Sequence, residues 1–247
     1  MIEQQKWANH WSTRKEIDRL LANVTAERFR IQHILRYLPK GRVLEAGCGD
    51  GKYVFYLARL GYDVYGVDFV RDVIERDRLL SKKEGIGDSA KFFVMDVATL
   101  QFPDNYFDGY ISMGVIEHSH DPTIPLREAH RTLKVGGIAF ISVPNKLSPN
   151  SLVRFIRLKR GKESLLWQRE YTRWQLRTFA VSVGFECIAS FNCNVRDSLR
   201  SMLQMQSPKL GGLPNPFYYL RGIIYWLLAR ESVFSLIGYH SVFVGRK

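Results

Sequence analysis

The chain has 247 residues, of which 46% are hydrophobic, and it carries a formal net charge of +12. This length allows one α/β domain with an appendage and a core that needs no covalent cross-links, which argues against two equal domains or a small disulfide scaffold. The three cysteines form no close pair and indicate neither a disulfide framework nor a zinc site. Charges throughout the first twenty residues argue against a secretory signal, so a cytoplasmic location is expected.

The positive charge is concentrated in the C-terminal part of the chain. Residues 150–247 hold fifteen Lys and Arg against five Asp and Glu, which leaves a net charge of +2 for residues 1–149. Such asymmetry indicates an anionic partner, namely a phosphate-bearing substrate, an acidic membrane surface or nucleic acid. A basic surface without a dedicated partner is the alternative.

The first predicted elements form an N-terminal helical arm over residues 1–40. Aromatic and basic side chains recur there at helical spacing: Trp7, His10, Trp11 and Arg14. A second helix is expected over residues 25–38, because apolar residues from Ile31 to Leu38 share one face and Pro39 then ends the pattern. The aromatic face either covers a binding site or docks the arm on the domain.

A strand, a glycine loop and a second strand that ends in an acid come next. Residues 42–46 form the first strand, residues 47–51 form a loop with three glycines, and the second strand ends at Asp68. This is the layout of a nucleoside-binding βαβ unit. A dinucleotide site needs glycine at the sixth loop position, where this chain has Lys52. Glu45 would repel a pyrophosphate but suit an ammonium and a sulfonium, so we expect a nucleoside with a cationic tail.

The alternation of strands and helices continues to about residue 145. A charged helix is expected over residues 72–84, with Val73, Ile74 and either Leu79 or Leu80 facing inward. The next elements are strands over residues 92–95, 107–113 and 138–143, a helix over residues 124–133 and a turn over residues 134–137. This alternation predicts a parallel sheet with helices on both faces, and the ligand of such a sheet lies beyond the carboxyl ends of its strands.

Residues 146–247 are expected to complete the sheet with basic and aromatic helical insertions. On a helix, residues 151–162 place an apolar stripe beside cations, as in interfacial segments or in a lid that packs on the domain. A helix over residues 170–186 and a last strand over residues 241–245 follow. Arginines interrupt the apolar segment 216–237, and no run reaches the roughly twenty residues that cross a bilayer, so helical cover is expected rather than a transmembrane helix.

Three stretches resemble the class I S-adenosylmethionine-dependent methyltransferases: VLEAGCGDG from Val43, FPDNYFDGYISMGVIEH up to His118, and LREAHRTLKVGG up to Gly137. The resemblance covers residues 43–144 and is strongest to small-molecule, type 11-like members such as the ubiquinone-pathway O-methyltransferases. It implies a doubly wound, Rossmann-like α/β fold with a seven-stranded sheet, mostly parallel with an antiparallel last strand. It also implies S-adenosyl-L-methionine as the cofactor.

By the same resemblance, the carboxyl edge of the sheet holds this cofactor. The glycine loop lies against the methionine part, and Glu45 helps to orient it. Asp68 accepts hydrogen bonds from the ribose hydroxyls. Asp96 and the Val97 amide meet the adenine, although a strand-end Asp that caps a turn is the alternative for Asp96. The expected cofactor-binding residues are Glu45, Gly47, Cys48, Gly49, Gly51, Asp68, Phe69, Asp96, Val97 and Met113.

The segment after the fourth strand contains the candidate catalytic residue, His118. An imidazole there can act as a general base if the methyl acceptor is a hydroxyl or phenol, or it can be a helix-start residue bonded to backbone. The neighbouring Glu117, His120 and Asp121 suggest a metal site. The resembling O-methyltransferases have a further Glu where this chain has Gly114, so no metal is expected.

These observations predict a methyltransferase that transfers a methyl group by in-line displacement to a small-molecule or lipid-linked acceptor. We expect residues 1–40 to form the arm, residues 41–145 the cofactor-binding core, and residues 146–247 the completion of the sheet and the acceptor pocket. Peripheral contact with an anionic membrane is consistent with the charge, and nucleic acid is a less favoured partner. The alternatives are an RNA or other nucleic-acid methyltransferase and a catalytically silent cofactor-binding module.

Overall fold

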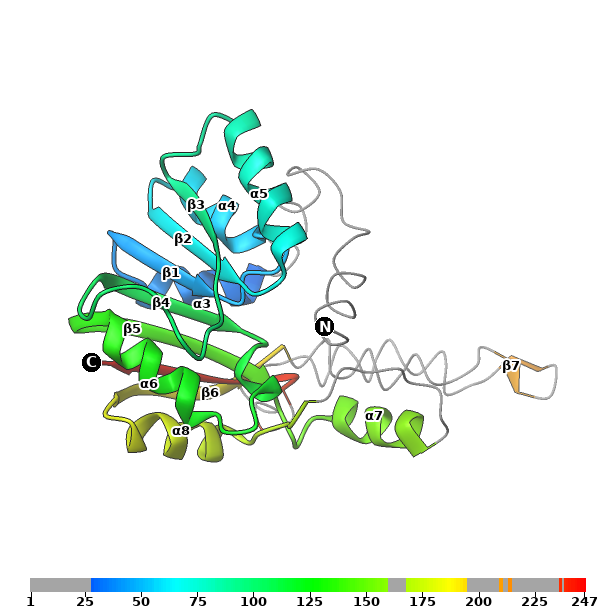
Figure 1. Ribbon diagram of the computed structural model, residues 1–247. Coiled ribbons are helices and arrows are strands. Elements are labelled where there is room, and N and C mark those ends of the chain that lie inside the picture. Colours follow the sequence, from blue (N-terminus) through cyan, green and yellow to red (C-terminus); the bar gives the residue numbers. More distant parts are fainter. Residues whose placement is uncertain (1–27, 160–167, 195–208, 211–212, 215–235, 237) are drawn as a thin grey trace.

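The computed structural model describes residues 28–159, 168–194, 209–210, 213–214, 236 and 238–247 (Figure 1). The aromatic face expected around Trp7 and Trp11, with His10 and Arg14, and nearly all of the apolar segment 216–237 lie outside these residues.

A seven-stranded sheet with strand order β3-β2-β1-β4-β5-β9-β6 forms the centre of the fold. In that order the strands are Ala90–Val94, Asp63–Asp68, Arg42–Ala46, Phe107–Met113, Leu133–Pro144, His240–Arg246 and Glu186–Cys193. The first five are mutually parallel, and β9 runs antiparallel between β5 and β6. The expected fold class, with its antiparallel last strand, is confirmed. A separate two-stranded ribbon pairs β7 (Lys209–Leu210) with β8 (Leu213–Pro214).

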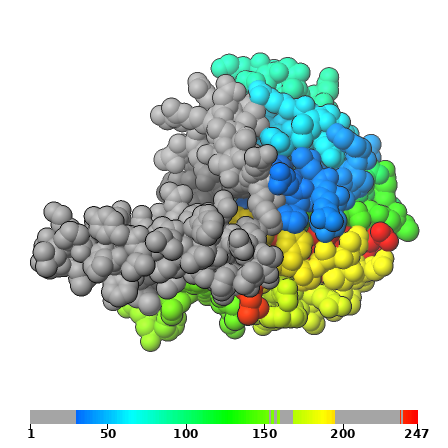
Figure 2. All heavy atoms as spheres, turned by 180° about the vertical axis from the view of Figure 1, so that it is seen from behind, coloured from blue at the N-terminus to red at the C-terminus, as the bar shows by residue number. Residues whose placement is uncertain are grey.

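Helices cover both faces of this sheet, because successive strand residues point to opposite sides and both sides are apolar. On one face, α3 (Arg28–Tyr37), α4 (Lys52–Arg59) and α5 (Arg71–Lys83) pack against a core that includes Val43 and Phe140. On the other, α6 (Thr123–Thr132) and α8 (Arg173–Ser182) pack against a core that includes Leu44 and Phe243. In Figure 2 the first face is seen, with α3 in blue beside the yellow segment that contains β6.

The strand β5 begins earlier than the sequence predicts. Leu133 already pairs with Phe107, and the ladder shifts register before Gly109 pairs with Ile138. Gly136 has a positive φ of 81° within this stretch. The turn predicted over residues 134–137 is therefore wrong: these residues belong to an irregular start of the strand, and α6 ends at Thr132.

One further helix differs from expectation, and on α5 the structure decides between the two leucines that the sequence left open. The helix expected over residues 170–186 is shorter, because Thr172 caps it: the Gln175 amide donates to Thr172 Oγ1, and Gln175 Oε1 accepts from the Thr172 amide. On α5, Leu79 is 70% exposed, and Leu80 packs on the core.

The helix α7 (Pro149–Lys159) follows β5 and lies beyond the end of the sheet, at the lower right of Figure 1. Its apolar side chains Leu152, Phe155 and Leu158 are exposed. Within the part of the chain that the structure describes, no helix has the length and apolar character needed to cross a membrane.

Candidate functional site

The glycine loop between β1 and α4 has a backbone that favours glycine. Gly47, Gly49 and Gly51 have φ values of 73°, 52° and 67°. A Cβ on Gly47 would lie 2.4 Å from Val115 Cγ2, so the loop closely approaches the segment after β4. The loop is tied to β2, because the Gly47 and Cys48 amides donate to the Val67 carbonyl at 2.8 and 2.9 Å.

Asp68 joins the end of β2 to the same loop. Its Oδ2 accepts from the Gly49 amide at 3.0 Å, and its Oδ1 accepts from the Val70 amide at 3.0 Å. Burial raises the pKa of the Asp68 carboxyl, and these backbone donors oppose that shift. The carboxyl therefore sets the loop conformation at the carboxyl edge of the sheet, where the sequence placed it.

Glu45 lies buried at the N-terminus of α4. Its Oε2 accepts from the Val54 amide at 3.1 Å. Burial raises the pKa of Glu45 well above its ordinary value, while the Lys52 ammonium lowers it. Burial likewise raises the pKa of the Cys48 thiol, with a further contribution from the Asp68 charge, so Cys48 is a protonated packing residue.

Asp77 on α5 is a buried acid that sequence reasoning missed. The residue is 0% exposed, and Arg76 donates twice to its Oδ1, at 2.7 and 2.8 Å. Its Oδ2 has no hydrogen-bond partner among the described residues and would lie 3.0 Å from a Cβ on Gly51. Burial raises the pKa of Asp77 to about 7. The available signal was its spacing, three residues after Ile74, on the inward face of the helix.

A second group that the sequence did not indicate joins α3, α4 and β9. Arg30 Nη1 donates to the Tyr53 hydroxyl at 3.2 Å, and Arg30 Nη2 donates to His240 Nε2 at 2.7 Å. Burial and then the Arg30 charge lower the pKa of His240 well below its ordinary value, so the imidazole is neutral. Because β9 is antiparallel, His240 at its start lies beside Pro144 at the carboxyl end of β5.

The expected adenine residues follow β3. Asp96 is exposed, and its Oδ1 accepts from the Ala98 amide at 2.8 Å, while its carbonyl accepts from the Thr99 amide at 3.1 Å. This is the turn-capping arrangement that the sequence left open. Val97 and Phe69 are partly buried after the neighbouring strands β3 and β2.

The segment after β4 contains a buried carboxyl rather than a metal cluster. The partly buried Met113 ends β4, and a short 3-10 helix, Ile116–His118, follows. Glu117 is buried, and its Oε2 meets no hydrogen-bond partner in the described part of the chain. Burial raises the pKa of Glu117 to about 8, although the Arg154 charge opposes this. His118 is partly buried, and its amide donates to the Val115 carbonyl at 3.0 Å.

Neither His120 nor Asp121 joins Glu117 as a ligand. Asp121 Oδ1 accepts from the Thr123 amide and hydroxyl, at 2.8 and 2.7 Å, and so caps α6. Across the described residues, no group of three or more His, Cys, Asp and Glu side chains is arranged to hold a metal ion.

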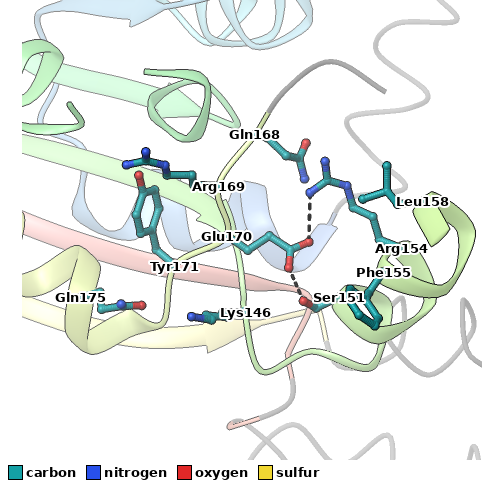
Figure 3. Close-up of a pocket in the computed structure, with 10 residues that line it drawn as sticks. All are labelled: Lys146, Ser151, Arg154, Phe155, Leu158, Gln168, Arg169, Glu170, Tyr171 and Gln175. Atoms are coloured by element: carbon teal, nitrogen blue, oxygen red, sulfur yellow. Dashed lines mark hydrogen bonds and ion pairs between the residues drawn. The ribbon is translucent and has the colours of Figure 1, made fainter. Parts of the chain in front are cut away.

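A pocket of about 450 Å³ lies between α7 and the segment that precedes α8 (Figure 3). Its lining combines three cations, one carboxylate and two exposed apolar side chains: Lys146, Arg154, Arg169, Glu170, Phe155 and Leu158. The Arg169 amide donates to the Glu117 carbonyl at 2.8 Å. Through this contact the pocket adjoins the segment after β4, at the carboxyl edge of the sheet.

Comparisons with known proteins agree with this geometry. Residues 44–141 match the model of the methyltransferase domain family. A ubiquinone biosynthesis O-methyltransferase of Xanthomonas axonopodis pv. citri (strain 306) is 35% identical over 120 residues, which are 47% of this chain and 49% of that protein. The chain thus spans about half the length of the curated relatives it matches.

Solved structures share the fold at low identity. The [4+2]-cyclase SpnF superposes with a TM-score of 0.64 at 20% identity, covering 90% of this chain and 80% of that one. Geranyl diphosphate C-methyltransferase from Streptomyces coelicolor A3(2) has a TM-score of 0.64 at 14% identity, covering 100% and 98%. The matched domain and the relatives support the resemblance to the class I S-adenosylmethionine-dependent methyltransferases, and the sheet topology agrees with the fold that this resemblance implies.

Proposed function

We propose that this protein is an S-adenosylmethionine-dependent methyltransferase that acts on a small-molecule or lipid-linked acceptor. The observation that carries the proposal is the glycine loop, whose positive-φ backbone is bonded to the Asp68 carboxyl at the carboxyl edge of the sheet. A Cβ on Gly47 or Gly51 would lie 2.4 Å from Val115 or 2.9 Å from Phe92, so these two glycines let the loop pack closely on its neighbours. The matched family and the O-methyltransferase relatives support the same reaction class.

The cofactor would lie along this edge. The loop from Gly47 to Gly51, with Cys48 beneath it, would contact the methionine part. Asp68 and Phe69 would meet the ribose, and Asp96 with the Val97 amide the adenine. Met113 would close the site from the end of β4.

Charged groups at the loop match a zwitterionic amino acid. Glu45 and Asp77 place two buried carboxyl groups beneath the loop, and the ammonium and sulfonium of a bound ligand would favour the charged forms of these groups. Arg30, beside Tyr53 in the first turn of α4, supplies a cation for the carboxylate. This arrangement disfavours a pyrophosphate.

S-adenosylmethionine would supply a methyl group activated for in-line displacement. The protein's main task is then to hold the acceptor in line with it, which requires orientation more than strong acid or base chemistry. For a hydroxyl acceptor, His118 would accept the proton. Glu117 is protonated near neutral pH, so it would serve as a hydrogen-bond donor rather than as a base.

Calorimetry with S-adenosylhomocysteine tests the cofactor proposal, and micromolar binding is expected. Absence of such binding would refute it. The reaction is tested by incubating a cell extract with the protein and deuterium-labelled cofactor, then identifying by mass spectrometry which product gains the label. Cofactor binding without any labelled product across a broad acceptor screen would favour the silent binding module.

We also propose the domain organisation that the sequence suggests. Residues 41–145 would bind the cofactor, and residues 146–247 would complete the sheet and form the acceptor site, with residues 1–40 as a covering arm. The position of β6 and β9 after residue 145 and the pocket beside α7 support this division. A nucleic-acid acceptor would instead give a gel shift that declines steeply with salt.

Peripheral membrane contact is consistent with α7. Phe155 and Leu158 are 53% and 46% exposed beside the cations of this helix. Phe155→Ser should weaken co-sedimentation with phosphatidylserine vesicles, whereas Leu79→Ser, at an exposed leucine on α5, should not. Equal losses would contradict a specific role for α7.

A further inference from the structure

We propose that the pocket beside α7 binds an amphipathic anion, with its phosphate or carboxylate group on Arg154 and Lys146 and its apolar body on Phe155 and Leu158. The inference rests on the proposed function, because it names the chemical class of the methyl acceptor. It concerns a different set of side chains from those that would bind the cofactor.

The charge of the pocket lining favours an anionic ligand. Three cations and one carboxylate line it, so its net charge is positive. Glu170 is held on both sides, because Ser151 Oγ donates to its Oε2, and Arg154 Nη1 lies 3.6 Å from its Oε1 (Figure 3). The single carboxylate of Glu170 cannot neutralise both Arg154 and Lys146. An anionic ligand group would balance the remaining charge.

The hydrogen-bond donors of Arg154 are incompletely used by the described residues. Its side chain is 14% exposed, and its Nε is buried with no hydrogen-bond partner among the described residues. The 3.6 Å separation from Glu170 exceeds a normal hydrogen bond. A partly desolvated guanidinium whose carboxylate neighbour lies beyond hydrogen-bond distance favours an oxyanion, since a charged donor without a close acceptor is costly.

The surroundings of the pocket give the ligand its remaining features. Phe155 and Leu158 form an apolar wall on α7. On the opposite side, the Arg169 backbone is bonded to the Glu117 carbonyl and its Nη1 to the His120 carbonyl, at 2.8 and 3.3 Å. A volume of about 450 Å³ is within the range of small-molecule sites. A ligand anchored on Arg154 would thus reach toward the segment that contains His118.

The test measures binding of defined probes by calorimetry in the absence of cofactor. Decyl phosphate, below its micelle concentration, should bind about tenfold more tightly than both decanol and inorganic phosphate, because it uses the cations and the apolar wall together. Equal binding of decanol, or of decyltrimethylammonium, would overturn the proposal. Binding to phosphatidic acid vesicles but not to monomeric decyl phosphate would overturn it in favour of a membrane surface.

Variants with opposite expected effects separate binding from folding. Arg154→Gln should weaken decyl phosphate binding about tenfold or more. Glu170→Gln removes the competing carboxylate and should strengthen binding severalfold. Arg177→Gln, at an exposed position of α8 outside the pocket lining, is the matched control and should change nothing. If both pocket variants weaken binding equally, Arg154 has a structural role and the proposal fails.

S-adenosylhomocysteine binding is measured on the same variants. It should be unchanged, because the glycine loop and Asp68 are separate from the pocket. Wild-type protein that binds S-adenosylhomocysteine but not decyl phosphate would identify a failure of the acceptor proposal alone. The reverse result identifies a failure of the cofactor proposal.

Discussion

At the scale of single residues, buried carboxyl groups dominate the site. Both carboxylate oxygens of Asp68 accept hydrogen bonds from backbone amides, and one oxygen of Glu45 does so. In Glu117 and Asp77, one carboxyl oxygen has no hydrogen-bond partner among the described residues. These differences assign different tasks. Asp68 fixes the loop, whereas burial raises the pKa of Glu117 to about 8 and that of Asp77 to about 7.

The first prediction concerns Asp68. Asp68→Asn should lower S-adenosylhomocysteine affinity by about tenfold to a hundredfold, because an amide cannot accept from both Gly49 and Val70 and binds ribose hydroxyls less strongly. Calorimetry measures the change. Asp63→Asn, at the opposite end of β2, is the matched control and should leave affinity unaltered. Equal affinity of wild type and Asp68→Asn would contradict the role of Asp68.

The second prediction concerns the pH dependence of stability at Glu117. Its pKa rises on folding from about 4.5 to about 8, so the native state binds more protons between these values. The free energy of unfolding should therefore decline as pH rises from about 4.5 to about 8, with Asp77 adding to the decline up to about pH 7. Glu117→Gln removes the Glu117 part of this loss.

Thermal denaturation checks this expectation. Near pH 4 the variant and wild type both carry a largely neutral side chain in the folded and the unfolded states, so they should melt within a degree or two of each other. Above pH 8 the variant should melt higher by roughly 2–4 °C for each kcal/mol regained. The same difference in melting temperature at both pH values would show that burial of charge at Glu117 is not the cause.

At the scale of elements, the sequence predicted the strands best where they are buried and clearly bounded. The strands predicted over residues 42–46 and 107–113 coincide with β1 and β4. The early start of β5 was missed because Leu133 is held by pairing with Phe107, a contact between strands that no local pattern reveals. The contact between Arg30 and His240, 210 residues apart, was missed for the same reason.

The sequence also failed to predict which polar residues lie on the inward faces of helices. Asp77 was not singled out from the sequence, although its spacing from Val73 and Ile74 places it on the inward face of the helix. At the glycine loop, by contrast, the residue types themselves reported the geometry, since repeated glycines anticipate the positive φ values observed.

The third prediction concerns the loop between β1 and α4. Gly47→Ala combines backbone strain with a Cβ 2.4 Å from Val115, so it should lower both the melting temperature and S-adenosylhomocysteine affinity. Gly61→Ala is the control, because Gly61 also has a positive φ, of 80°, but a Cβ there meets no described atom within 4 Å. It should cost only about 1 kcal/mol.

A second substitution identifies the clash. Val115→Ala should restore part of the stability and affinity of Gly47→Ala by removing the methyl groups nearest the new Cβ, and it should not rescue Gly61→Ala. If Val115→Ala leaves Gly47→Ala unimproved, backbone strain alone explains the defect, and the close approach of the loop to the segment after β4 has no energetic weight.

At the scale of the whole molecule, the charge divides the chain into two functional parts. Residues 1–149 carry +2 and contain the glycine loop, whereas residues 150–247 carry +10 and contain most of the pocket beside α7. A zwitterionic cofactor needs no excess charge, but an anionic acceptor gains from it. The two ligands should therefore respond differently to salt.

The fourth prediction tests this difference. Raising NaCl from about 0.02 to about 0.5 M shortens the screening length from about 20 Å to about 4 Å. S-adenosylhomocysteine affinity should change less than about twofold, because its charges pair locally, whereas decyl phosphate affinity should fall about tenfold. Calorimetry on the same protein sample measures both. A parallel fall would mean that the basic C-terminal part acts on both ligands alike, and the division of charge would then have no bearing on recognition.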